Sequence, residues 1–109
     1  MQILIQVVSS KGRSLRDAIR THPRLNEHNL RVTEHQKPGR PHGWCKVHSR
    51  SPDRHGAINL EWDANTSILL CRVVTRGKGR PNLIIGDFVD FLLRHFPKRI
   101  QAICIIPRP

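Results

Sequence analysis

The chain has 109 residues, of which 19 are lysine or arginine and 8 are aspartate or glutamate, so its formal net charge at neutral pH is +11. This length is typical of one domain, and we expect residues 1–109 to form a single domain. No apolar run approaches the about 20 residues that a membrane-spanning helix needs, and the N-terminus lacks the features of a secretory signal. We therefore expect a cytoplasmic protein with no membrane partner, and the charge favours a polyanionic ligand.

The N-terminal part of the chain predicts a strand followed by a helix. Residues 2–8 form an apolar run rich in β-branched side chains, which favours a central strand buried on both faces. Ser14 and Asp17 have the spacing of a capping box, with aspartate in place of the usual glutamate or glutamine, and an apolar stripe follows them. Because the residue before a proline disfavours helical geometry, Pro23 ends this helix.

The rest of the chain alternates short periodic segments with polar loops that are rich in proline and glycine. The alternation of apolar and polar side chains has the period of two expected in strands, and a longer apolar stripe indicates a second helix. The elements expected from these patterns are strands at 29–34 and 43–49, a hairpin formed by 57–63 and 67–74, a helix at 82–96 with Asn82 as its N-cap, and a strand at 99–106.

This order of elements contains a β-α-β…β-α-β skeleton. The predicted fold class is α+β, a ferredoxin-like sandwich in which two helices pack on one face of a mainly antiparallel sheet. The segment at about 23–55 would then be a basic insertion. The alternative is a more irregular α+β domain with a five- or six-stranded sheet.

The positive charge is concentrated in two places. Residues 9–54 hold eleven basic against four acidic residues, a net charge of +7, and a smaller cluster lies at 72–80 ahead of the second helix, where backbone amides also favour anions. Nucleic acid, either DNA or RNA, is the leading partner, bound through its phosphates and stacked on Trp44. The predicted contact residues are Lys11, Arg13, Arg16, Arg20, Arg24, Lys37, Arg40, Trp44, Lys46, Arg50, Arg54, Arg76, Lys78 and Arg80.

Histidine suggests an enzymatic alternative, a metal-independent ribonuclease of the toxin-like kind. Six of the seven histidines recur every six or seven residues between positions 22 and 55. RNA cleavage without a metal needs a base, an acid and a cation beside the phosphorane. The first two roles would fall to His42, His48, His55 and Glu61, with a nearby lysine or arginine as the cation.

No metal or other cofactor is expected from the sequence. The chain has no C-x-x-C pair, and in a strand Cys45 would face the opposite side from His42 and His48. All three cysteines are expected to be reduced, buried thiols. A third interpretation of the basic surface is an interaction module for an acidic protein partner, or a homodimer in which the second copy shields it.

Overall fold

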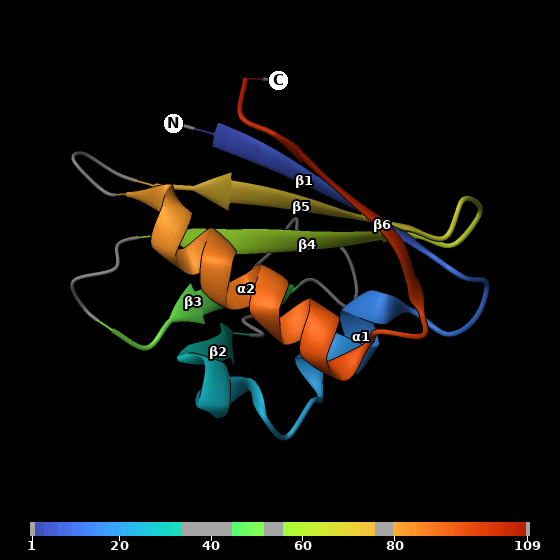
Figure 1. The fold of residues 1–109 in the computed structure, drawn as a ribbon, viewed down its shortest axis with the longest axis horizontal. Helices are drawn as coiled ribbons and strands as arrows, with labels where there is room; N and C mark the ends of the chain where they lie inside the picture. The colour runs from blue at the N-terminus through green and yellow to red at the C-terminus, as the bar shows by residue number, and fades with distance from the viewer. Residues whose placement is uncertain (1, 34–44, 52–55, 76–79, 109) are drawn as a thin grey trace, which may run out of the picture.

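The computed structural model describes residues 2–33, 45–51, 56–75 and 80–108 (Figure 1). Over these residues the chain forms a small α+β domain with a six-stranded antiparallel sheet and two α-helices, which confirms the predicted fold class at that level. The elements, in chain order, are β1 (Gln2–Ser9), α1 (Leu15–Arg20), the 3-10 helix η1 (Leu25–His28), β2 (Leu30–Thr33), β3 (Cys45–Ser49), β4 (Ala57–Asp63), β5 (Ile68–Val74), α2 (Pro81–His95) and β6 (Ile100–Ile106).

The strands lie in the order β2-β3-β4-β5-β1-β6, and each neighbouring pair is antiparallel. β1 pairs with β5 on one side and β6 on the other, so the prediction of an internal strand at residues 2–8 is confirmed. The prediction that both of its faces are buried is wrong. Ile3, Ile5 and Val7 are buried, but the intervening side chains are only half-buried, because the described helices pack on one face of the sheet.

The first helix begins where the capping pattern predicts. Ser14 is the N-cap of α1, and its Oγ accepts a hydrogen bond from the Asp17 amide at 3.2 Å. The helix ends at Arg20, three residues ahead of Pro23, and the chain continues into η1. Asn29 closes η1 in the left-handed conformation, with a φ of 61°, and this turn directs the chain into β2.

The second helix begins earlier than the sequence pattern suggests. Its N-cap is Arg80 and not Asn82, because Pro81 occupies the first helical position, where its fixed φ and missing amide hydrogen suit a helix start. The helix ends at His95, as expected ahead of Pro97. Neither α2 nor any other helix in the described part of the chain is long and apolar enough to cross a membrane.

The core lies between one face of the sheet and the two helices, and α2 crosses in front of the strands in Figure 1. Phe88 and Phe91 of α2 are fully buried, as are Leu15 and Ile19 of α1. They pack over the inward rows of the strands, which include Ile5, Val7, Leu30, Cys45, Val47, Ile58, Leu60, Leu69, Cys71 and Val73. The inward rows therefore span β2 to β1, and the core extends across most of the sheet.

Part of the predicted basic insertion belongs to the sheet itself. β2 and β3 pair with each other, and β3 continues the sheet from β4. Leu30, Cys45 and Val47 from these strands are buried in the core. The expected strands at 29–34 and 43–49 are therefore confirmed over Leu30–Thr33 and Cys45–Ser49, and they widen the sheet.

The cysteines occupy two different environments. Cys45 and Cys71 are buried thiols, and burial raises the pKa of the Cys71 thiol. Cys104 is exposed, so the expectation of burial is wrong for this residue. Cys104 belongs to β6, the strand at the end of the sheet, and lies opposite Gln6 of β1. Its side chain points to the face without a described helix.

Candidate functional site

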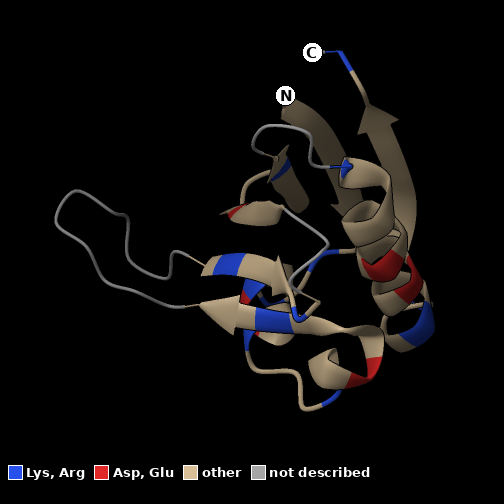
Figure 2. Ribbon diagram, turned by 90° about the vertical axis from the view of Figure 1, so that its left-hand side faces the viewer, with Lys and Arg blue, Asp and Glu red and all other residues tan. Residues whose placement is uncertain are grey.

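The face of the sheet that no described helix covers carries a group of cationic side chains. Residues directly opposite each other on neighbouring strands point to the same face. Arg31 is opposite His48, Lys46 is opposite Asn59, and Asn59 is opposite Arg72. The basic positions on β2 and β3 can be followed in Figure 2, where the acidic positions of α2 lie on the other side of the sheet. We call Arg31, Lys46, His48 and Arg72 the sheet-face cluster.

The electrostatics of this cluster are visible at His48. Burial of its ring lowers the pKa of His48 from the usual 6.5, and the nearby Arg31 and Lys46 lower it further. Burial disfavours the charged form of the ring, and a protonated His48 would also be repelled by Arg31 and Lys46. An anion placed over the cluster would reverse this effect and favour the protonated ring.

The cationic surface continues at one end of the sheet. Arg50 follows β3 and Arg80 precedes α2, and both side chains are exposed. Gly56 and Thr75 lie side by side at this end, since a Cβ built on Gly56 would stand 3.2 Å from the Thr75 Cγ2 atom.

Arg16 and Arg20 of α1, which the sequence predicts as nucleic-acid contacts and which we call the arginine ridge, are less cationic than the sequence suggests. The guanidinium groups of Arg16 and Arg20 both lie within 4 Å of the Asp17 carboxylate, at 3.7 and 3.6 Å. Arg24 lies beyond the helix and pairs with Glu27 at 3.9 Å. Lys11 and Arg13 precede the helix and are exposed. Because α1 packs on the covered face, this ridge and the sheet-face cluster lie on different sides of the sheet.

One further cation, Arg99, has a structural role that the sequence did not reveal. Its Nε donates a hydrogen bond to the Ser9 Oγ at 2.9 Å, and its Nη2 donates to the Arg13 carbonyl. Its guanidinium also lies 5.6 Å from the centre of the Trp62 ring. Arg99 thus joins the end of β1, the start of α1 and β4.

The predicted catalytic residues are only partly described, and those that are described lie apart. His48 lies opposite Ala57 of β4, and Glu61 is four residues further along the same strand. At about 3.3 Å per residue, Glu61 is about 13 Å from Ala57 along β4, so it lies far from His48. Cys45 points into the core and His48 to the opposite face, as expected for a strand. Outside the described residues lie the predicted site residues Lys37, Arg40, Trp44, Arg54, Arg76, Lys78, His42 and His55.

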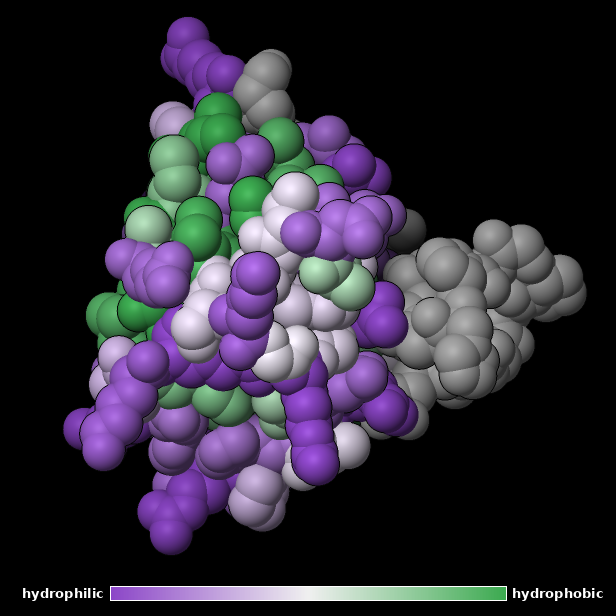
Figure 3. All heavy atoms as spheres, turned by 90° about the vertical axis from the view of Figure 1, so that its right-hand side faces the viewer, coloured by the Kyte–Doolittle hydropathy of each residue, from purple (hydrophilic) through white to green (hydrophobic). Residues whose placement is uncertain are grey.

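An apolar surface lies along β6. A shallow groove between α2 and β6 is lined by aliphatic side chains, including Val89, Ile100 and Ile103. At its margins Leu93 is 54% exposed and Ile105 is 46% exposed. Figure 3 shows the hydrophobic residues gathered along the side of the molecule that holds β6. This surface has no cation in its lining and is distinct from the sheet-face cluster.

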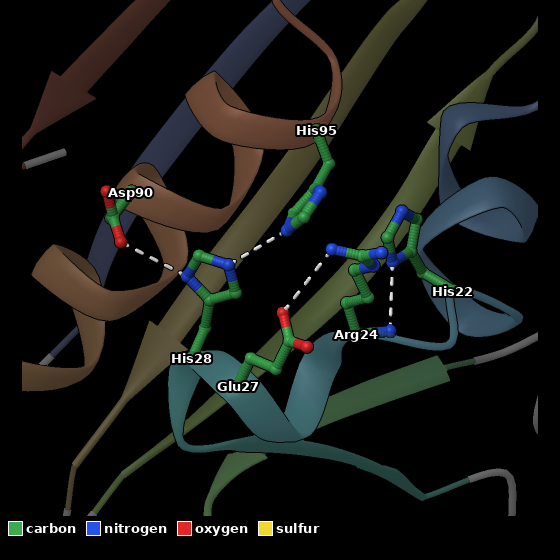
Figure 4. A network of polar contacts seen from close by, with 6 residues as sticks. All are labelled: His22, Arg24, Glu27, His28, Asp90 and His95. Carbon is green, nitrogen blue, oxygen red and sulfur yellow. Dashed lines mark hydrogen bonds and ion pairs between the residues drawn. The ribbon is translucent and has the colours of Figure 1, made fainter.

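A histidine cluster lies where η1 meets the last turns of α2 (Figure 4). The Nδ1 atom of His28 is 3.1 Å from the Asp90 Oδ2 atom, and its Nε2 atom is 2.9 Å from the Nε2 atom of His95. The His22 ring packs against the His95 ring with their centres 4.5 Å apart. His28 itself is buried, whereas His22 and His95 are half-buried. We call His22, His28, Asp90 and His95 the histidine cluster.

When both rings are neutral, the contacts of this cluster assign the donor and acceptor roles of the imidazole nitrogens. A carboxylate only accepts, so the Nδ1 of His28 donates to Asp90. The Nε2 of a neutral His28 then carries a lone pair, and the Nε2 of His95 donates to it. Burial lowers the pKa of both His22 and His95, and nearby histidines and Arg24 lower it further, while Glu27 raises it.

In the sequence, His22 and His28 stand out only as members of a regular spacing of histidines, and no local pattern marks Asp90 as a partner of either. The signal that was available is that Asp90 and His95 lie about one turn and a half apart on one helix. Their partner, His28, is 62 residues from Asp90, and this pairing depends on the fold. Within the described ranges, no group of three or more histidine, cysteine, aspartate or glutamate side chains is arranged around a metal position.

Comparison of the chain with known protein families, with curated proteins and with solved structures finds no match in any of the three.

Proposed function

We propose that this protein binds nucleic acid, and that the phosphates contact the sheet-face cluster and the exposed arginines at the adjacent end of the sheet. The observation that carries the proposal is that Arg31 and Lys46 lie beside His48, and that Arg72 lies in the same lateral row as Lys46, on a face with no described helix over it. A protein with a formal charge of +11 attracts polyanions in general. The cluster gives that attraction a specific surface.

The polar side chains of this face support phosphate contacts over base stacking. Asn59 lies between Lys46 and Arg72 in one lateral row, Thr33 lies at the β2 end of the same row, and both add hydrogen-bond donors beside the cations. Such contacts fix the position of a nucleic acid without reading its sequence. We therefore expect binding with a strong dependence on salt and little dependence on base sequence.

A triple variant tests the surface directly. Replacing Arg31, Lys46 and Arg72 with glutamine lowers the net charge by three, as does replacing Arg94, Lys98 and Arg108, which are exposed elsewhere. Binding to fluorescent single-stranded RNA and duplex DNA is measured over a series of salt concentrations. We expect the first variant to reduce the slope of log affinity against log salt by about three, roughly one per lost phosphate contact.

The second triple variant, which changes the net charge by the same amount, shows whether binding depends on the sheet-face cluster or only on the net charge of the protein. If both triple variants lose affinity equally, the sheet-face cluster is not the binding surface. Absence of nucleic-acid binding at low salt would overturn the proposal as a whole. Capture of one acidic protein in stoichiometric amounts, with no nucleic acid, would favour an interaction module in its place.

The ribonuclease alternative has less support, because His48 and Glu61 are too far apart along the sheet to act on one phosphodiester. Incubation with RNA in the presence of EDTA tests it. We expect the RNA to remain intact.

We also infer that β1, α1, β4, β5, α2 and β6 form a ferredoxin-like unit that β2 and β3 extend. Two observations support this inference. The order of these elements along the chain is β-α-β-β-α-β, and both helices pack on one face of an antiparallel sheet. The extension supplies Arg31, Lys46 and His48, so three of the four cluster residues come from it.

A further inference from the structure

The contact between His28 and His95 brings two imidazole nitrogens of the same kind face to face. Their Nε2 atoms are 2.9 Å apart, and the two residues come from different elements, η1 and α2. Imidazole nitrogens bind transition metals at about 2.0–2.1 Å. Two such ligands at a right angle around one metal would be about 2.9 Å apart, which is the spacing of cis ligands in square-planar or octahedral coordination. The separation is therefore that of two cis ligands, with the ion to one side of the line between the nitrogens and in place of their hydrogen bond.

The surroundings of His28 match those of a metal-binding histidine. Its Nδ1 donates to the Asp90 carboxylate at 3.1 Å, which leaves the Nε2 lone pair directed at His95. Metal-ligating histidines commonly donate their second ring N–H to a carboxylate, which fixes the ring and raises its basicity. The His28 side chain is only 5% exposed, and the rings of Phe91 and His95 lie against it. The first ligand is therefore held rigidly.

His95 supplies a second ligand that is accessible. It is half-buried, and the His22 ring packs against it. Its ring also packs against the Phe91 ring, with the ring centres 5.2 Å apart, so His95 is held next to His28 from two sides. The cations Arg24 and Arg94 disfavour a bound metal, and the carboxylates of Glu27 and Asp90 offset them.

We propose that a divalent transition-metal ion of the nickel, copper and zinc group binds to the Nε2 atoms of both His28 and His95, to one side of the line that joins them, with Asp90 as the positioning carboxylate. The proton that His95 holds at Nε2 moves to its Nδ1, so the ring stays neutral as its lone pair turns to the metal. Water completes the coordination, because two protein ligands leave several positions open. Such a site is an exchangeable one, in contrast to the closed four-ligand sites that stabilise folds.

The test uses the full chain after removal of metal with a chelator. Zn²⁺ and Ni²⁺ are titrated by calorimetry, and long-range ¹⁵N–¹H NMR spectra of the imidazoles identify the nitrogens that shift. We expect saturable binding of one ion and a shift of the Nε2 resonances of His28 and His95. His95→Ala should abolish this binding, and His48→Ala, a histidine on the other face of the sheet, should leave it unchanged.

Two further variants separate ligation from folding. His95→Gln keeps a side-chain amide that can donate to His28 but coordinates metals poorly, so it should retain the melting temperature and lose the metal. Asp90→Asn should weaken metal affinity by about 10- to 100-fold, and Asp90→Glu should restore it in part. Metal binding that is unchanged in His95→Ala and His95→Gln, or no saturable binding by the native chain, would overturn the proposal.

Discussion

On the face of the sheet that α1 and α2 cover, the strands contribute aliphatic side chains that are almost completely buried, such as Ile5, Val47 and Ile58. On the other face the same strands change character along the sheet. β2 and β3 contribute Arg31, Lys46 and His48, whereas most of the residues that β1 and β5 contribute are half-buried and apolar, apart from Arg72 of β5 and the glutamines of β1. The side chains on the covered face are therefore uniformly apolar because they pack against the helices. Those on the other face do not pack against a described helix, and they vary from polar to apolar along the sheet.

Because the two faces differ in this way, substitutions on one face should affect mainly stability, and substitutions on the other should affect mainly binding. Burial of apolar area stabilises a fold by roughly 25 cal/mol per Å², so substitutions on the covered face should act on folding. Exposed charges contribute little to stability, so substitutions in the sheet-face cluster should act on partners. Each prediction below tests one side of this separation.

The largest effect is expected from Phe88, which is fully buried under α2. Phe88→Ala removes a ring from a packed core and should lower the free energy of unfolding by about 3–5 kcal/mol. Urea denaturation followed by circular dichroism measures this change. Leu93→Ala on the same helix, where the side chain is 54% exposed, should change it by no more than about 0.5 kcal/mol. Equal effects of the two variants would contradict the packing described.

A somewhat smaller loss of stability is expected from a substitution in β2, and it tests whether the sheet, including β2 and β3, unfolds as one unit. Leu30 lies in β2, at the end of the sheet, and is 1% exposed. Leu30→Ala should lower the free energy of unfolding by about 2–5 kcal/mol, if β2 unfolds together with the rest of the domain. A loss well below this range, with a separate early transition, would show that β2 and β3 open independently of the core.

Stability should also depend on pH in a defined direction. The pKa values of His22, His48 and His95 are lowered in the folded chain, so the unfolded chain binds more protons as the pH falls below about 6.5. The stabilisation is present above the unfolded pKa and is lost as the pH falls through the folded values. Urea denaturation between about pH 7.5 and about pH 5.5 should show decreasing stability. A His48→Gln variant should show a shallower decrease.

The smallest effect on stability, and the clearest on binding, is expected from Arg72. Arg72 is exposed on the uncovered face, so Arg72→Gln should change the free energy of unfolding by no more than about 0.5 kcal/mol. The same variant should reduce the salt slope of nucleic-acid binding by about one. Loss of stability without a change in slope would assign Arg72 to the fold and not to the proposed surface.

The elements of the fold were largely predictable because their signals are local. Alternation identified β4 and β5, and the Ser14 cap and the apolar stripe identified α1. The burial of the two faces of β1 was not predictable, since it depends on which face the helices cover. Cys104 was misjudged for the same reason: an apolar strand at the end of a sheet resembles a buried one in sequence.

The candidate sites were less predictable than the fold. Charge indicated a polyanion, but only strand register places Arg31, Lys46 and Arg72 together. The helix pattern suggested an uncompensated ridge, yet Asp17 lies between Arg16 and Arg20. Contacts between residues far apart in the chain, such as His28 with Asp90, leave no periodic signal in one sequence.

The outer edge of β6 has a consequence for how copies of this protein behave together. β6 lies at the end of the sheet and contains no charged residue, and no other described strand pairs with its outer edge, so an apolar strand can pair there with another chain. Mutual repulsion between copies with a charge of +11 opposes such pairing, and salt screens that repulsion. Increasing ionic strength should therefore weaken the proposed binding of a polyanion at the sheet-face cluster. The same change should strengthen self-association through the edge of β6, so the two interactions respond to salt in opposite ways.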